Sequence, residues 1–351
     1  MTKKGYLLLV CASVICALVA SIWVIRQQGQ VLRVGMVLDT GGDQDRGYNE
    51  YSLHGARSAA HTLGLEFEYV ISASKDEYEQ NIETMIRNGA DLIFTVGYTL
   101  ADATAAAARR YPDKQFAIID YAFTPGRGCA GNVADCYTEA GGLSNVTSIV
   151  FSEDQPAYLA GVLAACVSDT GELGIVAGEK IPPVVRLVEG FEKGARSINP
   201  GIITRKRYIP DFNDPVTGYG VGMSFISKGA DVLFCPAGAT GIGGLRSAKS
   251  AHVKAIGVDV DQYLTFPEAG SVLITSVMKN VDVAAGVIVQ KFAAGKLTSG
   301  INSFDLKSGA VGLAPFHEWE DKIPQACKDL VAQANKKLVL HPEILKGETE
   351  Y

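Results

Sequence analysis

Short apolar runs and amphipathic stretches alternate along most of this chain. Nine runs have the length and composition of buried strands: residues 31–39, 65–72, 91–97, 116–120, 173–178, 204–210, 231–238, 254–259 and 272–278. Between them lie segments with helical patterning, among them residues 78–89, 101–112, 186–198 and 218–229. Strands that alternate with helices are typical of parallel sheets, and near-continuous Val/Ile/Leu strands are typical of sheets buried on both faces. The pattern therefore predicts an α/β protein with parallel sheets flanked by helices.

Two segments of this pattern resemble each other. Residues 89–120 begin GADLIFTVG and end KQFAIID, and residues 229–259 begin GADVLFCPAG and end VKAIGVD. Both run strand, helix, strand, and both close on an aspartate at the carboxyl end of a strand. Because ligands of open α/β sheets bind outside the carboxyl ends of strands, Asp120 and Asp259 are candidates to face a cleft shared by two similar halves. The alternative for each aspartate is a cap on the following turn or helix.

The composition fits two lobes and excludes one class of partner. The chain has 351 residues, 47% of them hydrophobic, which is ample for two lobes with separate cores. Its formal net charge is -6, and it contains no basic run. We therefore expect no nucleic-acid binding, because the required electrostatic footprint is missing.

The N-terminus has the pattern of an export signal or a membrane anchor. Lys3 and Lys4 precede the apolar span Gly5–Ile25, and Arg26 follows it. This span approaches the ~20 residues that cross a bilayer and is longer than many cleaved signals. Cys11 and Cys16 lie inside the span as candidates for lipidation after cleavage. We expect residues 1–30 to tether the protein to the cell membrane, with the folded part on the extracytoplasmic, or periplasmic, face.

Five cysteines remain; Cys327 is assigned no role, and the other four fall into two groups. Cys166 and Cys235 lie in apolar runs and are expected to be buried, inert thiols. Cys129 and Cys136 share one polar loop, GCAGNVADCY, and in an oxidising compartment they could close a small disulfide ring. The alternative is a pair of zinc ligands, although the spacing is wide and no further Cys or His clusters nearby. We favour the disulfide and expect no metal site or cofactor.

The segment DTGGDQDRGYNE, residues 39–50, closely resembles the D-x-G-G-x-x-D-K-S-F-N signature of the basic membrane protein (BMP) family. The resemblance continues in order through SEDQPAYLAGVLAA, GIVAGEKIPPVVRLVEGFEKGA, DFNDPVTGYGVGMSFISKGADVLF, AGATGIGG, IGVDVDQY and LITSVMKN. Members of this family are extracytoplasmic substrate-binding lipoproteins, and many bind nucleosides for ABC importers. The resemblance implies a two-lobed fold of the type I periplasmic binding proteins, with three hinge crossings between the lobes.

The resemblance also implies an organisation of the chain. We expect a first lobe from residues 31–146 and 277–300 and a second lobe from residues 147–276 and 301–318. Residues 319–351 are expected to form a C-terminal helix and tail.

Carried over by position, the family's ligand contacts fall on seven residues. Tyr48 and Phe212 match two rings on either face of a purine, and Asn49 and Asp120 match groups at the edge of the base. The other matches are a carboxylate that holds the ribose diol, a lysine that contacts the ribose and a close backbone approach: Asp259, Lys279 and Gly238. The chain departs from the family at Arg46 and Gly47, in place of Lys and Ser, and at Tyr48, in place of Phe.

The chemistry of these residues supports the ligand-binding roles, but several of them could have a structural role instead. A flat base favours aromatic stacking, and a vicinal diol favours an ionised carboxylate. Tyr48 or Phe212 could instead be a hydrophobic staple beneath its loop. Asp261 is the nearest competitor of Asp259 for the diol and could be a helix cap instead. Asp39, Asp43 and Asp45 are expected to shape turns through bonds to the backbone. Lys279 is expected to pair with an acid, for which Asp259 is the obvious candidate.

Three functions compete at this stage. We favour a purine nucleoside receptor that closes around its ligand, carries out no chemistry and delivers the ligand to a membrane permease. A binding protein for a sugar or another small polar ligand is the first alternative, because fold alone does not choose the ligand. A nucleoside- or dinucleotide-using enzyme is less favoured, because GATGIGG (residues 238–244) lacks the full G-x-G-x-x-G order.

Overall fold

The first of two six-stranded sheets is entirely parallel. The computed structural model describes residues 31–345. In this sheet the strand order is β13-β7-β4-β3-β1-β2. The bounds are β1 (Arg33–Leu38), β2 (Glu66–Ile71), β3 (Leu92–Val96), β4 (Gln115–Ile119), β7 (Val146–Phe151) and β13 (Gly300–Phe304). Two short strands, β5 (Thr124–Pro125) and β6 (Gly128–Cys129), pair with each other beside it.

The second sheet repeats this order. Its strands run β14-β12-β11-β10-β8-β9, and all pairs are parallel except the antiparallel pair β12–β14. The bounds are β8 (Glu172–Ala177), β9 (Ile203–Tyr208), β10 (Val232–Phe234), β11 (Lys254–Asp259), β12 (Leu273–Lys279) and β14 (Val311–Leu313). The two segments that resemble each other in sequence therefore supply equivalent strands, β3–β4 and β10–β11.

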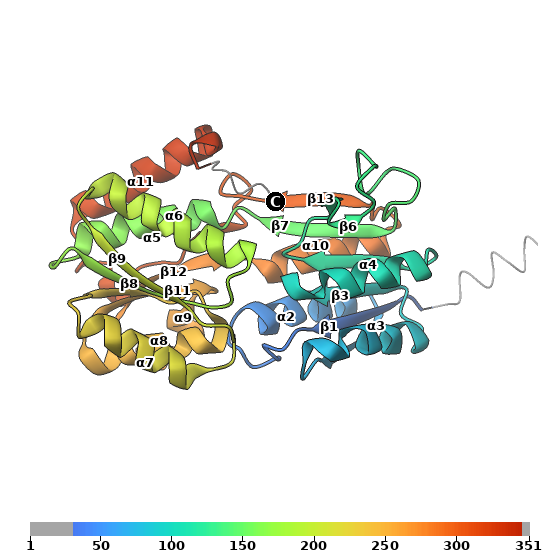
Figure 1. Ribbon diagram of the computed structural model, residues 1–351, viewed down its shortest axis with the longest axis horizontal. Coiled ribbons are helices and arrows are strands. Elements are labelled where there is room, and N and C mark those ends of the chain that lie inside the picture. The colour runs from blue at the N-terminus through green and yellow to red at the C-terminus, as the bar shows by residue number, and fades with distance from the viewer. Residues whose placement is uncertain (1–30, 346–351) are drawn as a thin grey trace, which may run out of the picture.

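Helices cover both faces of each sheet, and the two lobes lie side by side in Figure 1. The first lobe carries α2 (Tyr48–Thr62), α3 (Tyr78–Arg87), α4 (Ala101–Arg110) and α10 (Val281–Ala293). The second lobe carries α5 (Asp154–Val167), α6 (Pro182–Ile198), α7 (Pro215–Ile226), α8 (Gly238–Ala251), α9 (Gln262–Thr265) and α11 (Gln325–Leu340). Short 3-10 turns are η1 (Lys75–Glu77), η2 (Tyr98–Leu100), η3 (Pro267–Ala269), η4 (His317–Trp319) and η5 (Pro342–Ile344).

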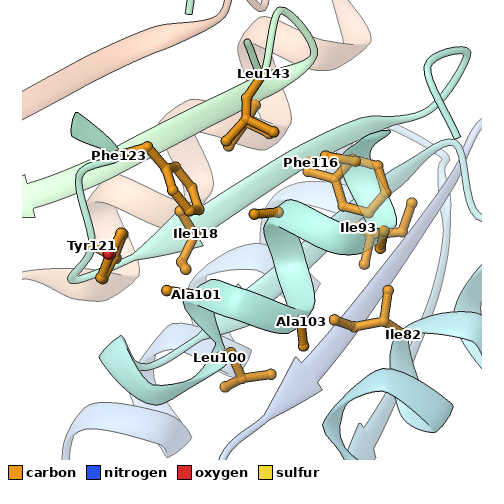
Figure 2. Packing of buried hydrophobic residues seen from close by; sticks show 14 of the residues in the cluster. Ile82, Ile93, Leu100, Ala101, Ala103, Phe116, Ile118, Tyr121, Phe123 and Leu143 are labelled. Atoms are coloured by element: carbon orange, nitrogen blue, oxygen red, sulfur yellow. The ribbon is translucent and has the colours of Figure 1, made fainter. Parts of the chain in front are cut away.

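Each face of each sheet has its own apolar core. The core beneath α3 and α4 is shown in Figure 2, where Phe116 and Ile118 of β4 meet Ile82 of α3 and Ala101 of α4. Every residue of β3 is buried, because helices lie on both sides of the sheet. The α/β architecture predicted from the run pattern is confirmed.

The chain crosses between the lobes three times. The crossings follow β7, β12 and β13, after Phe151, Lys279 and Phe304. The three expected boundaries differ in detail. Positions 146/147 and 300/301 fall at the starts of β7 and β13, which belong to the first sheet, and position 276/277 falls inside β12, which belongs to the second. β7 joins the first sheet by pairing with β4, and β13 joins it by pairing with β7; the local pattern of neither strand reveals this pairing.

Two disulfides are present among the described residues. Cys129 is bonded to Cys136 in the loop where a small ring was predicted. The prediction of an inert thiol at Cys166 was wrong, because Cys166 of α5 is bonded to Cys327 of α11. Cys235 is a free, buried cysteine, as predicted.

The predicted signal peptide or anchor, including Cys11 and Cys16, lies outside the described residues. Across residues 31–345, no helix has both the length and the apolar character that crossing a membrane requires. The predicted C-terminal amphipathic helix is α11, which packs on α5, and residues 346–351 of the expected tail also lie outside the described part.

We predict that the long-range disulfide contributes more stability than the local one. The Cys166–Cys327 bond spans 161 residues of sequence and the Cys129–Cys136 bond spans 7. Loop-closure entropy then gives stabilisations of about 5 and about 2 kcal/mol, respectively. Urea unfolding of the C166A/C327A and C129A/C136A double variants measures both. A larger loss in C129A/C136A would contradict the prediction.

Candidate functional site

A cavity lies between the carboxyl ends of the two sheets. All seven residues carried over from the resemblance line it: Tyr48, Asn49, Asp120, Phe212, Gly238, Asp259 and Lys279. Residues from both lobes contribute, so the cavity exists only where the lobes meet. Its remaining lining includes apolar side chains of α6 and of the segment just before it: Ile181, Pro183, Val184 and Leu187.

The glycine-rich loop of residues 39–49 is held by two aspartates. Asp45 accepts hydrogen bonds from the backbone N–H groups of Gly47, Asn49 and Glu50, at 2.7 to 3.1 Å. Asp39 accepts from the backbone of Gly41 and from the Asn49 amide, both at 2.9 Å. These bonds place Tyr48 and Asn49 at the start of α2 facing the cavity. Asp39 lines the cavity as well, a role that sequence reasoning missed.

The close approach of β3 to this loop requires a glycine. Gly97 follows β3 with a φ of 120°, and a Cβ at that position would lie 2.5 Å from Asp39 Oδ2. No L side chain fits that space without displacing Asp39.

Asp120 and Asp259 occupy equivalent places in the two lobes. Each lies at the carboxyl end of its strand, β4 or β11, and both adopt left-handed backbone conformations, with φ of 74° and 67°. A non-glycine residue rarely adopts this conformation, and it persists where the surroundings enforce it, often at functional sites. The helix cap falls instead to Asp261, which accepts from Tyr263 N and pairs with His317.

The second lobe presents Phe212 from the loop before α7. The ring packs directly on Gly178, where a Cβ would lie 2.3 Å from Phe212 Cε1. The loop is anchored by Thr240, whose hydroxyl donates to Asp211 O and accepts from Asp214 N. Phe212 and Tyr48 therefore reach the cavity from opposite lobes.

A buried chain of charges joins the lobes at one side of the cavity. Lys279 Nζ lies 2.6 Å from the carboxylate of Asp120 and 3.0 Å from Glu153 Oε1, and Glu153 Oε2 lies 2.7 Å from Arg186 Nε. Lys279 ends β12 and Asp120 follows β4, so their bond connects the two lobes. The expectation that Lys279 pairs with Asp259 is corrected. Asp259 stands in register with Met278, one residue before Lys279, and the Lys279 ammonium pairs with the carboxylates of Asp120 and Glu153 instead.

Burial and neighbouring charge shift the pKa of the acids around this chain. Burial raises the pKa of Asp259 to about 7, although the nearby Lys279 charge opposes the rise. Burial likewise raises the pKa of Asp39 to about 6, against its hydrogen bonds from Gly41 and Asn49. For Glu153, burial alone would raise the pKa, but Arg186 and Lys279 outweigh it and hold the pKa below its ordinary value.

Three buried side-chain atoms in the described part of the chain have no hydrogen-bond partner: Tyr48 Oη, Asn49 Oδ1 and Asp120 Oδ1. Asp120 Oδ1 does lie close to Lys279 Nζ, but the hydrogen bond forms to Oδ2. All three residues line the cavity. Because buried polar groups are almost always paired, these atoms indicate a polar ligand.

Glu153 and Arg186 were not predicted as site residues, although both stand in segments that carry the family resemblance. Tyr98, which also lines the cavity, was missed too. Across residues 31–345, no group of three or more His, Cys, Asp or Glu side chains is arranged to hold a metal ion. The site therefore offers aromatic surface, fixed charges and unpaired polar atoms to a ligand.

Comparison with known proteins agrees with this architecture. Aeropyrum pernix K1 supplies a crystal structure described as an ABC transporter system solute-binding protein. It superposes with a TM-score of 0.78 at 26% identity and covers 89% of this chain and 92% of that one. A myo-inositol binding protein from Caulobacter shares the fold at 15% identity, with a TM-score of 0.59 over 84% of this chain and 96% of that one.

Similar sequences and a family profile identify the family to which this chain belongs. The ABC transporter nucleoside-binding protein BmpA of Lactococcus lactis is 29% identical and aligns with 88% of this chain and 87% of its own length. An uncharacterised lipoprotein of Pyrococcus furiosus is 30% identical, with 89% and 77% aligned. The profile of the Bmp family, described as "ABC transporter substrate-binding protein PnrA-like", matches residues 32–343. The chain therefore belongs to the Bmp family of ABC transporter substrate-binding proteins.

Proposed function

We propose that the cavity binds a purine nucleoside, which the two lobes enclose by closing about the three crossings. One observation carries the proposal. Tyr48 and Phe212 enter the cavity from opposite lobes, beside a buried acid and unpaired polar atoms. Two rings suit the two faces of a flat base, and stacking contributes roughly 1–3 kcal/mol per base.

The polar groups are assigned by chemistry. An ionised Asp259 accepts both hydroxyls of a ribose diol, because each hydroxyl is a donor. Asn49 Oδ1 has no hydrogen-bond partner, and Asp120 Oδ1 keeps acceptor capacity beyond its contact with Lys279, so both suit N–H groups at the edge of the base. Tyr48 Oη can donate or accept. Lys279 contacts the ribose, and the backbone at Gly238 approaches the ligand closely.

The proposal extends to the setting of the receptor. A membrane permease of an ABC importer would recognise the closed form, and the N-terminal segment would tether the receptor outside the cytoplasm. Support comes from the relatives, one described as a nucleoside-binding protein and another as a lipoprotein. Like other members of a substrate-binding family, this receptor would release its ligand unchanged.

The direct test is thermal unfolding of residues 31–351 with a panel of ligands, after unfolding and refolding to remove any bound nucleoside. Ligand at a hundredfold over Kd stabilises by ≈ 2.7 kcal/mol, which should raise the midpoint by a few degrees. We expect a shift with inosine, adenosine or guanosine and none with ribose. A shift with free sugars but none with nucleosides would replace the proposal with a sugar receptor.

Asp259→Asn should weaken nucleoside binding far more than binding of the free base. A hydrogen bond to a charged group contributes about 1.5–3 kcal/mol, so losing the carboxylate should raise Kd about tenfold or more. Calorimetric titration with inosine and hypoxanthine measures both. Asp261→Asn is the matched control, because Asp261 caps α9 and does not line the cavity. Equal losses for nucleoside and base would contradict the diol role.

Nucleoside affinity should rise with pH between about 5 and 8. The pKa of Asp259 is raised to about 7, so the acceptor form is scarce below that pH and affinity falls roughly tenfold per unit. The same shift means that Asp259 binds its proton more tightly in the folded protein than in the unfolded chain. Its contribution to the free energy of unfolding therefore falls as pH rises from about 4 to about 7. Calorimetry across this range, repeated with Asp259→Asn, should show a flat profile in the variant. A flat wild-type profile would refute this account.

A further inference from the structure

One buried carboxylate lies behind the cavity and outside its lining. Glu153 immediately precedes α5, on the first crossing between the lobes, and its side chain is 1% exposed. The described residues that line the cavity do not include it. Its role therefore has to be sought in the groups that it contacts.

Each oxygen of Glu153 pairs with a different cation. Oε1 lies 3.0 Å from Lys279 Nζ, at the second crossing, and Oε2 lies 2.7 Å from Arg186 Nε, on α6. The residues on either side of Arg186 include Val184 and Leu187, which line the cavity. A single carboxylate thus ties two crossings to the helix that forms part of the cavity wall.

Stability alone does not account for this arrangement. Taking ions out of water costs about as much as their pairing returns, and well-packed apolar side chains would often serve the fold as well. Buried charges beside the cavity therefore indicate that the site requires these groups in defined positions. We propose that Glu153 is a positioning residue, which holds the Lys279 ammonium at the cavity edge and couples ligand binding to lobe closure.

This inference rests on the proposed nucleoside receptor. Lys279 and Glu153 both join the second lobe, so they stay together when the lobes open, whereas Asp120 moves away with the first lobe. Glu153 then keeps the ammonium in place for the next closure. Without Glu153, the ammonium is free to pair with Asp259 and to occupy the carboxylate that the diol requires.

The test compares Glu153→Gln with the wild type in calorimetric titrations with inosine from pH 5 to 8. We expect Kd at pH 8 to rise about tenfold or more. We also expect the pH midpoint of binding to fall below the wild-type value, because the variant removes a negative charge that raises the pKa of Asp259 and leaves the Lys279 charge that lowers it. The charges that act most strongly on the pKa of Asp259 are those of Lys279, Asp45, Asp120 and Glu153, and the substitution removes the charge of Glu153 alone. Glu153→Asp should recover part of the affinity.

Glu192→Gln is the matched control. Glu192 is also a buried carboxylate of the second lobe, with Lys206 Nζ at 2.8 Å and Arg196 Nη2 at 3.6 Å, and it does not line the cavity. This variant should lose thermal stability and keep the wild-type Kd and pH midpoint. A purely structural role for Glu153 would make the two variants behave alike.

The outcomes separate the two proposals. A folded Glu153→Gln protein with the wild-type Kd and pH midpoint overturns the positioning role and leaves the nucleoside receptor intact. If that variant does not fold, Arg186→Lys takes its place: a raised Kd supports the role and an unchanged Kd overturns it. Failure of the wild type to bind inosine, adenosine or guanosine overturns the proposed function and the role of Glu153 with it.

Discussion

The ion pair between Lys279 and Asp120 is the constraint on which the arrangement of the lobes depends. It joins a strand end of the second sheet to a strand end of the first, in surroundings almost free of water. A buried charge without its partner strongly destabilises the folded protein, so Lys279 and Asp120 must stay paired while both are buried. The lobes must therefore approach at this point in one register, and the cavity takes its shape beside it.

The same desolvation sets the chemistry of the cavity. Burial drives Asp259 and Asp39 toward their neutral forms, while Lys279 and Arg186 hold Glu153 ionised. The site thus keeps left-handed backbone, acids with raised pKa values and unpaired polar atoms together. A fold tolerates such features where a ligand later supplies the missing partners, and here the stable cores of both lobes surround them.

The rim of the cavity shows why the departures from the family pattern matter. Arg46, with a φ of 55°, lies over the Phe266 ring of the opposite lobe at 5.4 Å, and its carbonyl oxygen accepts a bond from Thr265. Lys75 of the first lobe pairs with Glu179 of the second at 2.9 Å. Arg46, one of the departures, therefore contributes to lobe–lobe contact, while Tyr48 keeps an aromatic ring at its position and adds a hydroxyl.

The sequence by itself determined the parallel α/β lobes, the repeat that matches Asp120 with Asp259, and the residues that gather at the strand ends, because period, apolar runs and motif order are local properties of the chain. It did not determine where β7 and β13 pair, that Cys166 meets Cys327, or that Lys279 chooses Asp120 and Glu153 over Asp259. Those depend on which distant segments the packing of helices and sheets brings within bonding distance. Only the tertiary structure decided them, because an ion pair or a disulfide forms between groups that lie close together in space. The residues next to a charge or a thiol in the sequence do not identify its partner.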